Sequence, residues 1–76
     1  MSWKHFIVTK SGKIFSGDRS HADLAKENGI PEGDVHGGGY LDPGEKQVRG
    51  KSGAFGWYDP DVVRSLLPGW DVEEPL

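Results

Sequence analysis

The sequence contains no cysteine, a single methionine and no long apolar run. Without cysteine, the chain can form neither a disulfide framework nor a cysteine-ligated zinc site. No stretch approaches the roughly 20 apolar residues that cross a bilayer, and residues 1–8 lack the apolar centre of a secretory signal. We therefore expect a cytoplasmic protein that works in a reducing compartment and does not contact a membrane.

An excess of positive charge is also absent. Nine lysines and arginines stand against 12 acidic residues, which gives a net charge of −3. Residues 57–76 carry most of the imbalance, because they contain five acidic residues and a single arginine, Arg64. General nucleic-acid binders neutralise phosphates with many lysines and arginines, so this balance disfavours that class. A local basic patch within residues 1–56 remains compatible with it.

The length of 76 residues predicts one domain, near the lower limit for a self-sufficient hydrophobic core. We expect residues 1–72 to form this domain. Residues 73–76 begin with two glutamates and follow the last apolar segment, so we expect them to fray as an acidic C-terminal tail.

The first half of the sequence predicts a hairpin and a helix. Residues 5–17 contain two segments of β-branched and aromatic residues, separated by a turn at residues 10–12. Ser20 is a favourable N-cap for a short helix. Asn28-Gly29 is suited to end that helix, with Gly29 in the left-handed conformation.

The second half repeats this order. Residues 35–41 and 46–51 are expected to form two strands, joined by a type II turn at residues 42–45 with Gly44 at positive φ. On the return strand, alternation would place Gln47, Arg49 and Lys51 on one face. Asp59-Pro60 predicts the start of a second helix.

These elements predict an α+β fold, in which two β-hairpins form an antiparallel sheet with two short helices in the order ββαββα. The turn residues, helix caps and apolar positions agree at each junction, which supports this assignment. The expected core contains Phe6 or Ile7, Ile14 or Phe15, Leu24, Val48, Val63, Leu66 and Leu67.

The feature that demands an explanation is the run Gly37-Gly38-Gly39 inside a predicted strand. Glycine weakens a strand because it adds backbone entropy and offers no side chain to pack. Three in succession predict that something lies close against this backbone, either another element of the chain or a ligand.

The leading hypothesis is a non-catalytic module that binds a protein partner, with no metal or cofactor. Exposed aromatic residues and arginines are typical anchors of such contacts. Small accessory and inhibitor proteins of phages and mobile elements form one class compatible with this composition. The expected binding residues surround the glycine run and the return strand: Gly37, Gly38, Gly39, Tyr40, Arg49, Lys51 and Trp57.

Three alternatives stay open. A weak nucleic-acid binder would use the basic strand face of Arg49 and Lys51, with Tyr40 and Trp57 as stacking surfaces. A small metal-dependent enzyme would require His21 and His36 to converge with a carboxylate such as Asp23. Finally, three tryptophans in a small domain are compatible with a symmetric homodimer that covers leftover apolar surface.

Overall fold

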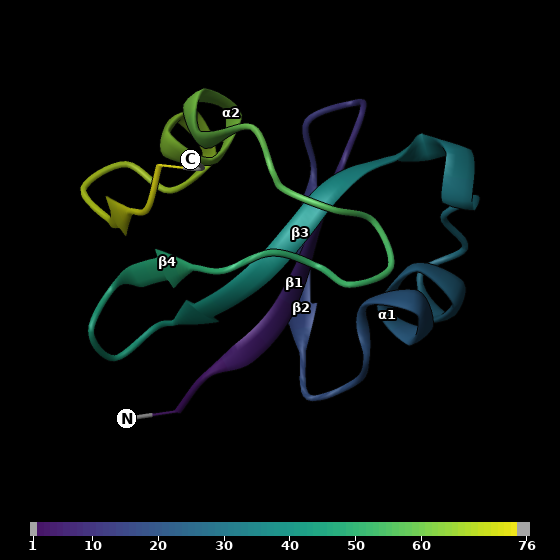
Figure 1. Cartoon of the computed structure of the whole chain (residues 1–76), viewed down its shortest axis with the longest axis horizontal. Helices are drawn as coiled ribbons and strands as arrows, with labels where there is room; N and C mark the ends of the chain where they lie inside the picture. Colours follow the sequence, from purple (N-terminus) through teal and green to yellow (C-terminus); the bar gives the residue numbers. More distant parts are fainter. Residues whose placement is uncertain (1, 75–76) are drawn as a thin grey trace.

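A computed structural model describes residues 2–74 of the chain. Its helices and strands are β1 (Lys4–Thr9), β2 (Ile14–Gly17), α1 (His21–Glu27), β3 (Val35–Asp42), β4 (Gln47–Arg49), α2 (Pro60–Leu66) and β5 (Asp71–Val72). A 3-10 turn, Glu32–Asp34, precedes β3. The strands form one sheet in the order β2-β1-β3-β4-β5, shown in Figure 1.

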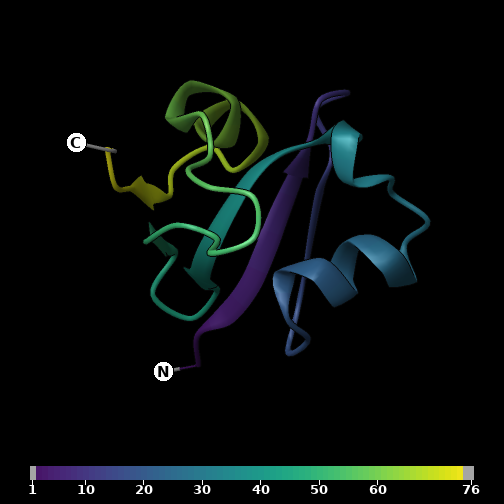
Figure 2. The ribbon, with the colours of Figure 1, turned by 45° about the vertical axis from the view of Figure 1, so that its right-hand side comes forward.

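The predicted α+β class is confirmed, and the domain has three layers. Helix α1 lies on one side of the sheet and α2 on the other, as Figure 2 shows. The predicted order ββαββα is incomplete, because α2 is followed by the short strand β5. This strand pairs in parallel with β4, so the sheet is mixed rather than antiparallel.

The signals for the first helix are confirmed. The Ser20 hydroxyl accepts a hydrogen bond from the Asp23 amide at 3.2 Å, as an N-cap residue does. At the other end, Gly29 adopts φ 67° and the Ile30 amide donates to the Ala25 carbonyl at 2.8 Å. This pattern is the Schellman motif, which folds Ile30 back onto the helix.

The start of α2 is also as predicted. The Asp59 carboxylate accepts a hydrogen bond from the Asp61 amide at 2.9 Å, and Pro60 occupies the first helical position. Tyr58 and Val63 flank this cap and are both buried in the same cluster, which fixes the angle at which the chain enters the helix.

The turn between β3 and β4 differs from the prediction. A type II turn requires positive φ at Gly44, but in this loop only Lys46 adopts it, with φ 53°. The cause is Asp42, whose Oδ1 accepts hydrogen bonds from the Gly44 and Glu45 amides at 3.0 and 3.3 Å. These hydrogen bonds between a side chain and the nearby backbone favour a different turn geometry.

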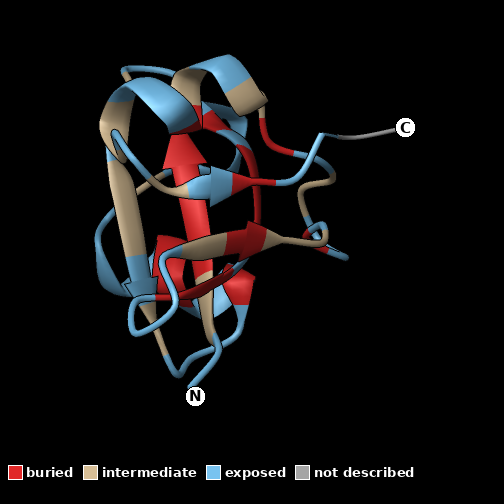
Figure 3. Cartoon of the chain, turned by 90° about the vertical axis from the view of Figure 1, so that its left-hand side faces the viewer, coloured by how far each residue is buried: buried red, intermediate tan, exposed pale blue. Residues whose placement is uncertain are grey.

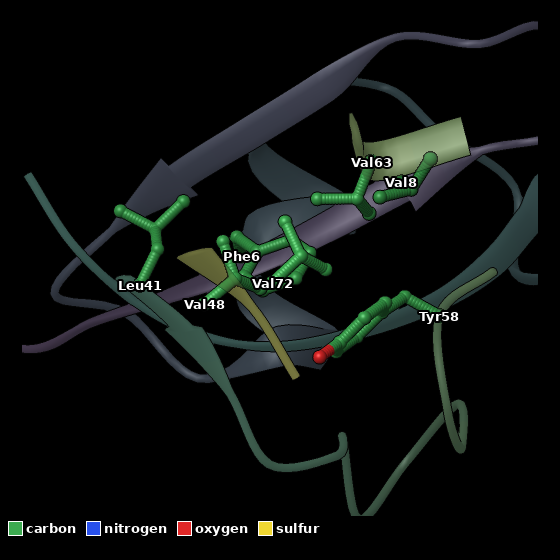
Figure 4. Close-up of a cluster of buried hydrophobic side chains, with 7 residues drawn as sticks. All are labelled: Phe6, Val8, Leu41, Val48, Tyr58, Val63 and Val72. Carbon is green, nitrogen blue, oxygen red and sulfur yellow. The ribbon is translucent and has the colours of Figure 1, made fainter. Parts of the chain in front are cut away.

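Two clusters of buried side chains form the core, and burial is greatest along the central strands, as Figure 3 shows. The predicted core residues that are buried are Phe6, Ile7, Leu24, Val48 and Val63, whereas those that are only partly covered are Ile14, Phe15, Leu66 and Leu67. On the α1 side the buried residues are Ile7, Leu24, Ala25 and Val35. On the α2 side, drawn in Figure 4, they are Phe6, Val8, Leu41, Val48, Tyr58, Val63 and Val72.

The glycine run lies against the main chain of residues 50–58, which we call the crossing segment. This segment runs across β3 in Figure 1 before it enters α2. The Gly38 amide donates to the Gly56 carbonyl at 3.2 Å, and the Gly38 carbonyl accepts from the Ser52 amide at 3.0 Å. A Cβ atom at Gly37 would overlap the Trp57 carbonyl, and one at Gly39 would lie 2.8 Å from the Arg49 carbonyl. The object against this backbone is therefore the chain itself.

Glu73 and Glu74, which belong to the segment expected to fray, form contacts with the domain. The Glu73 carboxylate accepts a hydrogen bond from the Gly50 amide at 2.9 Å, and its carbonyl accepts one from the Tyr58 hydroxyl at 2.7 Å. Glu74 forms an ion pair with Arg64. These contacts hold both residues to the domain, while Pro75 and Leu76 lie outside the described residues.

The close approach at Gly37 predicts a large effect from a single methyl group. We expect Gly37→Ala to lower the free energy of unfolding by about 1–3 kcal/mol or more, because the added carbon overlaps main-chain atoms that cannot turn aside. Denaturant unfolding followed by tryptophan fluorescence measures this change.

Gly33→Ala is the matched control for this experiment. Nothing lies within 4 Å of a Cβ at Gly33, and its φ is not in the left-handed region. Its effect should stay within roughly 0.5 kcal/mol or be slightly stabilising. Equal stabilities for the two variants would show that the glycine run does not serve close packing.

Candidate functional site

One row of side chains crosses three neighbouring strands on the α1 side of the sheet. His5 of β1 pairs with Tyr40 of β3, and Tyr40 pairs with Arg49 of β4. Directly paired residues of antiparallel strands point to the same face, so the three side chains lie next to one another. We call His5, Tyr40 and Arg49 the Tyr40 row; Tyr40, its central residue, is 36% exposed.

His21, the first residue of α1, packs against this row. The Ser20 cap fixes the helix start at this position, and His21 is 6% exposed. Its Nε2 donates a hydrogen bond to the Gly39 carbonyl at 2.8 Å. Its ring meets those of His5 and Tyr40 edge to face, with centroid distances of 4.8 and 5.4 Å. The Tyr40 ring is thereby packed on one side against two imidazoles.

Burial also sets the charge of His21. Removal from water lowers the pKa of His21 below its usual value of 6.5. The bond to the Gly39 carbonyl opposes this shift, and the nearby His5 adds to it. The imidazole is therefore neutral at pH 7, with its proton on Nε2 facing Gly39.

At the other end of the row, Arg49 is held by an acidic partner. Its guanidinium donates to the Asp71 carboxylate at 2.7 Å, to the Asp71 carbonyl at 3.1 Å and to the Val48 carbonyl at 2.8 Å. The bond to Asp71 raises the pKa of Arg49. The pair neutralises most of the positive charge that the sequence places here, and it ties β4 to β5.

Lys51 does not share the strand face predicted for it. Strand β4 ends at Arg49, and Gly50 turns the chain with φ 73°, so the alternation of Gln47, Arg49 and Lys51 is interrupted. Lys51 is exposed at the start of the crossing segment. The expected basic strand face therefore contains Arg49, paired with Asp71, but not Lys51.

Trp57 does not belong to the Tyr40 row, and the glycine run adjoins the row through its backbone alone. Trp57 is 37% exposed, but its carbonyl lies against Gly37 on the α2 side of the sheet. All three glycines are buried: a Cβ atom at Gly37 would meet the crossing segment, one at Gly39 would meet the Arg49 and Gly50 main chain, and one at Gly38 would meet Phe6 and His21. Of the residues predicted to bind a partner, the structure brings together Tyr40 and Arg49.

Within residues 2–74, no group of three or more histidine, cysteine, aspartate or glutamate side chains is arranged to hold a metal ion. His21 is committed to the Gly39 carbonyl, while His36 is exposed on β3. Asp23 supplies only its amide to the Ser20 cap. The convergence that a metal-dependent enzyme would require is therefore not present in this part of the chain.

His5 was not among the residues singled out from the sequence, and His21 was considered there only as a residue of a metal-dependent site. The alternation along β1, with Phe6 and Val8 on one side, places His5 and Ile7 together on the other and is the signal that could have found His5. No comparable signal in the sequence predicts that α1 starts directly above Tyr40, because that position depends on how the helix packs on the sheet.

Comparison with known proteins gives no relative: no family model, no curated protein and no solved structure matches this chain. None of the helices in the described part of the chain has the length and apolar character required to cross a membrane.

The neutral state of His21 predicts a specific dependence of stability on pH. Its pKa in the folded protein lies below its value in the unfolded chain, so the unfolded state binds the proton first as the pH falls. The contribution of His21 to the free energy of unfolding is therefore complete above about pH 6.5. It declines as the pH falls toward the lower pKa of His21 in the folded protein.

Thermal unfolding between pH 5 and pH 8 tests this prediction. In His21→Gln, which keeps a donor for Gly39 but does not titrate, the loss of stability below pH 6.5 should be smaller than in the native protein. His36→Gln, at an exposed histidine, should retain the native profile. Parallel profiles for the native protein and His21→Gln would contradict the prediction.

Proposed function

We propose that this protein is a non-catalytic protein-interaction module, and that the Tyr40 row is its contact surface. The observation that carries the proposal is the support beneath Tyr40: an exposed aromatic ring is packed against two imidazoles and lies beside an arginine held by a carboxylate. Tyrosine and arginine are enriched among the residues that dominate binding energy at protein interfaces.

The rigidity of the row supports its use in binding. Ordering a mobile side chain costs about 0.5–1.5 kcal/mol when two proteins associate. The Tyr40 ring has lost much of this freedom already, because His5 and His21 contact it within the folded protein. A partner would therefore gain contact with the ring at a small entropic cost.

The charge around the row favours a protein partner over a nucleic acid. Arg49 is paired with Asp71, and Glu73 lies close enough to raise the pKa of Arg49 further. A phosphate would compete with these carboxylates, whereas a polar protein surface could accept the row without displacing them. The exposed phenol of Tyr40 offers both an apolar ring and a hydrogen-bonding hydroxyl to such a surface.

The test is affinity capture on the immobilised protein from a lysate of the source cells, treated with nuclease and chelator. We expect a stoichiometric protein to be retained, and Tyr40→Ala to weaken its binding by about 2 kcal/mol, roughly thirtyfold. Titration of the purified partner by calorimetry gives this number.

Trp57→Ala is the matched control, because Trp57 is equally exposed but its main chain lies on the opposite side of β3. It should bind the partner like the native protein. Loss of binding in Trp57→Ala with full binding in Tyr40→Ala would move the contact surface to the crossing segment. Capture that disappears on nuclease or chelator treatment would contradict a protein-interaction module.

A further inference from the structure

Within residues 2–74, strand β2 forms one edge of the sheet. It pairs there with β1 and with no strand on its outer side. The Thr9 amide donates to the Lys13 carbonyl, which marks this pair as hydrogen-bonded. Bonded pairs alternate along an antiparallel ladder, so the next ones are Ile7 with Phe15 and His5 with Gly17. The amides and carbonyls of Ile14 and Ser16 therefore point away from the sheet.

A pocket of about 580 Å³ opens beside this edge, at the tip of the first hairpin. This volume lies within the range of small-ligand and side-chain sites. Its apolar lining consists of Phe15 from β2 and of Ile30 and Pro31 from the loop after α1. Because Phe15 borders both features, a strand added along β2 would place a side chain directly over the pocket.

The rim of the pocket is positively charged. Lys10 and Lys13 lie on it together with a single carboxylate, Asp34. Neither lysine forms an ion pair within residues 2–74, although four other lysines and arginines of this small domain do. The rim therefore has unneutralised charge that is complementary to an acidic group.

We propose that β2 binds an extended acidic peptide segment of a partner protein by β-strand addition. The segment runs antiparallel to β2 and forms its hydrogen bonds with Ile14 and Ser16. Its residue opposite Phe15 is apolar and enters the pocket. Because side chains alternate along a strand, the residue opposite Lys13 points to the same face and is acidic. The recognised pattern is thus an apolar residue, any residue and an acidic residue, in that order.

In this mode of recognition, main chain and side chains have different roles. Backbone hydrogen bonds along an exposed sheet edge provide affinity, and pockets for alternate side chains provide specificity. Lysines on an edge strand also discourage pairing with a second copy of the same edge. The proposal does not rest on the Tyr40 row, which lies at the other end of α1.

The probe is the fluorescein-labelled peptide Thr-Thr-Ile-Thr-Glu-Thr, amidated at its C-terminus and titrated to millimolar concentration. We expect saturable binding, with the Ile14 and Ser16 amides shifting in nuclear magnetic resonance spectra and exchanging more slowly with solvent. A peptide with lysine in place of glutamate, and one with alanine in place of isoleucine, should bind more weakly.

Two lysine variants distinguish binding at this site from nonspecific attraction between the peptide and positive charge. Lys13→Glu replaces attraction by repulsion and should weaken peptide binding about tenfold. Lys51→Glu changes the net charge equally on a different surface and should leave binding unchanged. Tyr40→Ala should also bind the peptide normally, so failure of the Tyr40 row as a partner surface would leave this result intact.

Three outcomes would overturn the proposal. The first is no binding at millimolar peptide, which would leave β2 as an edge protected by its lysines. The second is binding that moves other amides but not those of Ile14 and Ser16. The third is a dimer in sedimentation experiments whose Ile14 and Ser16 amides are protected without peptide, because a second copy would then occupy the edge.

Discussion

The whole arrangement depends on one contact between two stretches of main chain. At Gly37 and Gly39 the crossing segment and the end of β4 approach β3 more closely than a side chain would allow, and the absence of a Cβ atom at these two residues permits this approach. The contact also provides hydrogen bonds, because Gly38 exchanges bonds with Gly56 and Ser52. Strand β4 pairs only with residues 40–42 of β3, so the segment covers an edge that would otherwise be open.

The same glycines connect the two faces of the sheet. On the α2 side, the segment leads into Tyr58, whose hydroxyl binds the Glu73 carbonyl and whose burial raises its pKa to about 12. On the α1 side, the carbonyl of Gly39 holds His21 and, through it, the Tyr40 ring. The proposed contact surface therefore rests on the backbone that the crossing segment stabilises.

Local chemistry made the element boundaries predictable, because caps and turns act within a few residues of the chain. The Ser20 and Asp59 caps and the Gly29 helix end are examples. The sequence also indicated that a close contact at the glycine run was required, but it could not distinguish the chain from a ligand. The sequence did not predict how distant segments pack together. The parallel pairing of β5, the Arg49–Asp71 ion pair and the position of His21 all depend on contacts between residues far apart in the sequence. The type II turn predicted at residues 42–45 was wrong, because hydrogen bonds to the Asp42 side chain outweighed the preference of Pro43-Gly44 for that turn.

Amide hydrogen exchange at Ser52 and Gly38 tests the central contact most directly. If the crossing segment is part of the folded core, both amides exchange only on global unfolding, as slowly as those of Phe6 and Val8 in β1. If they exchange at the rate of an open loop while β1 stays protected, the crossing segment does not rest on the glycine run, and the fold does not depend on this contact.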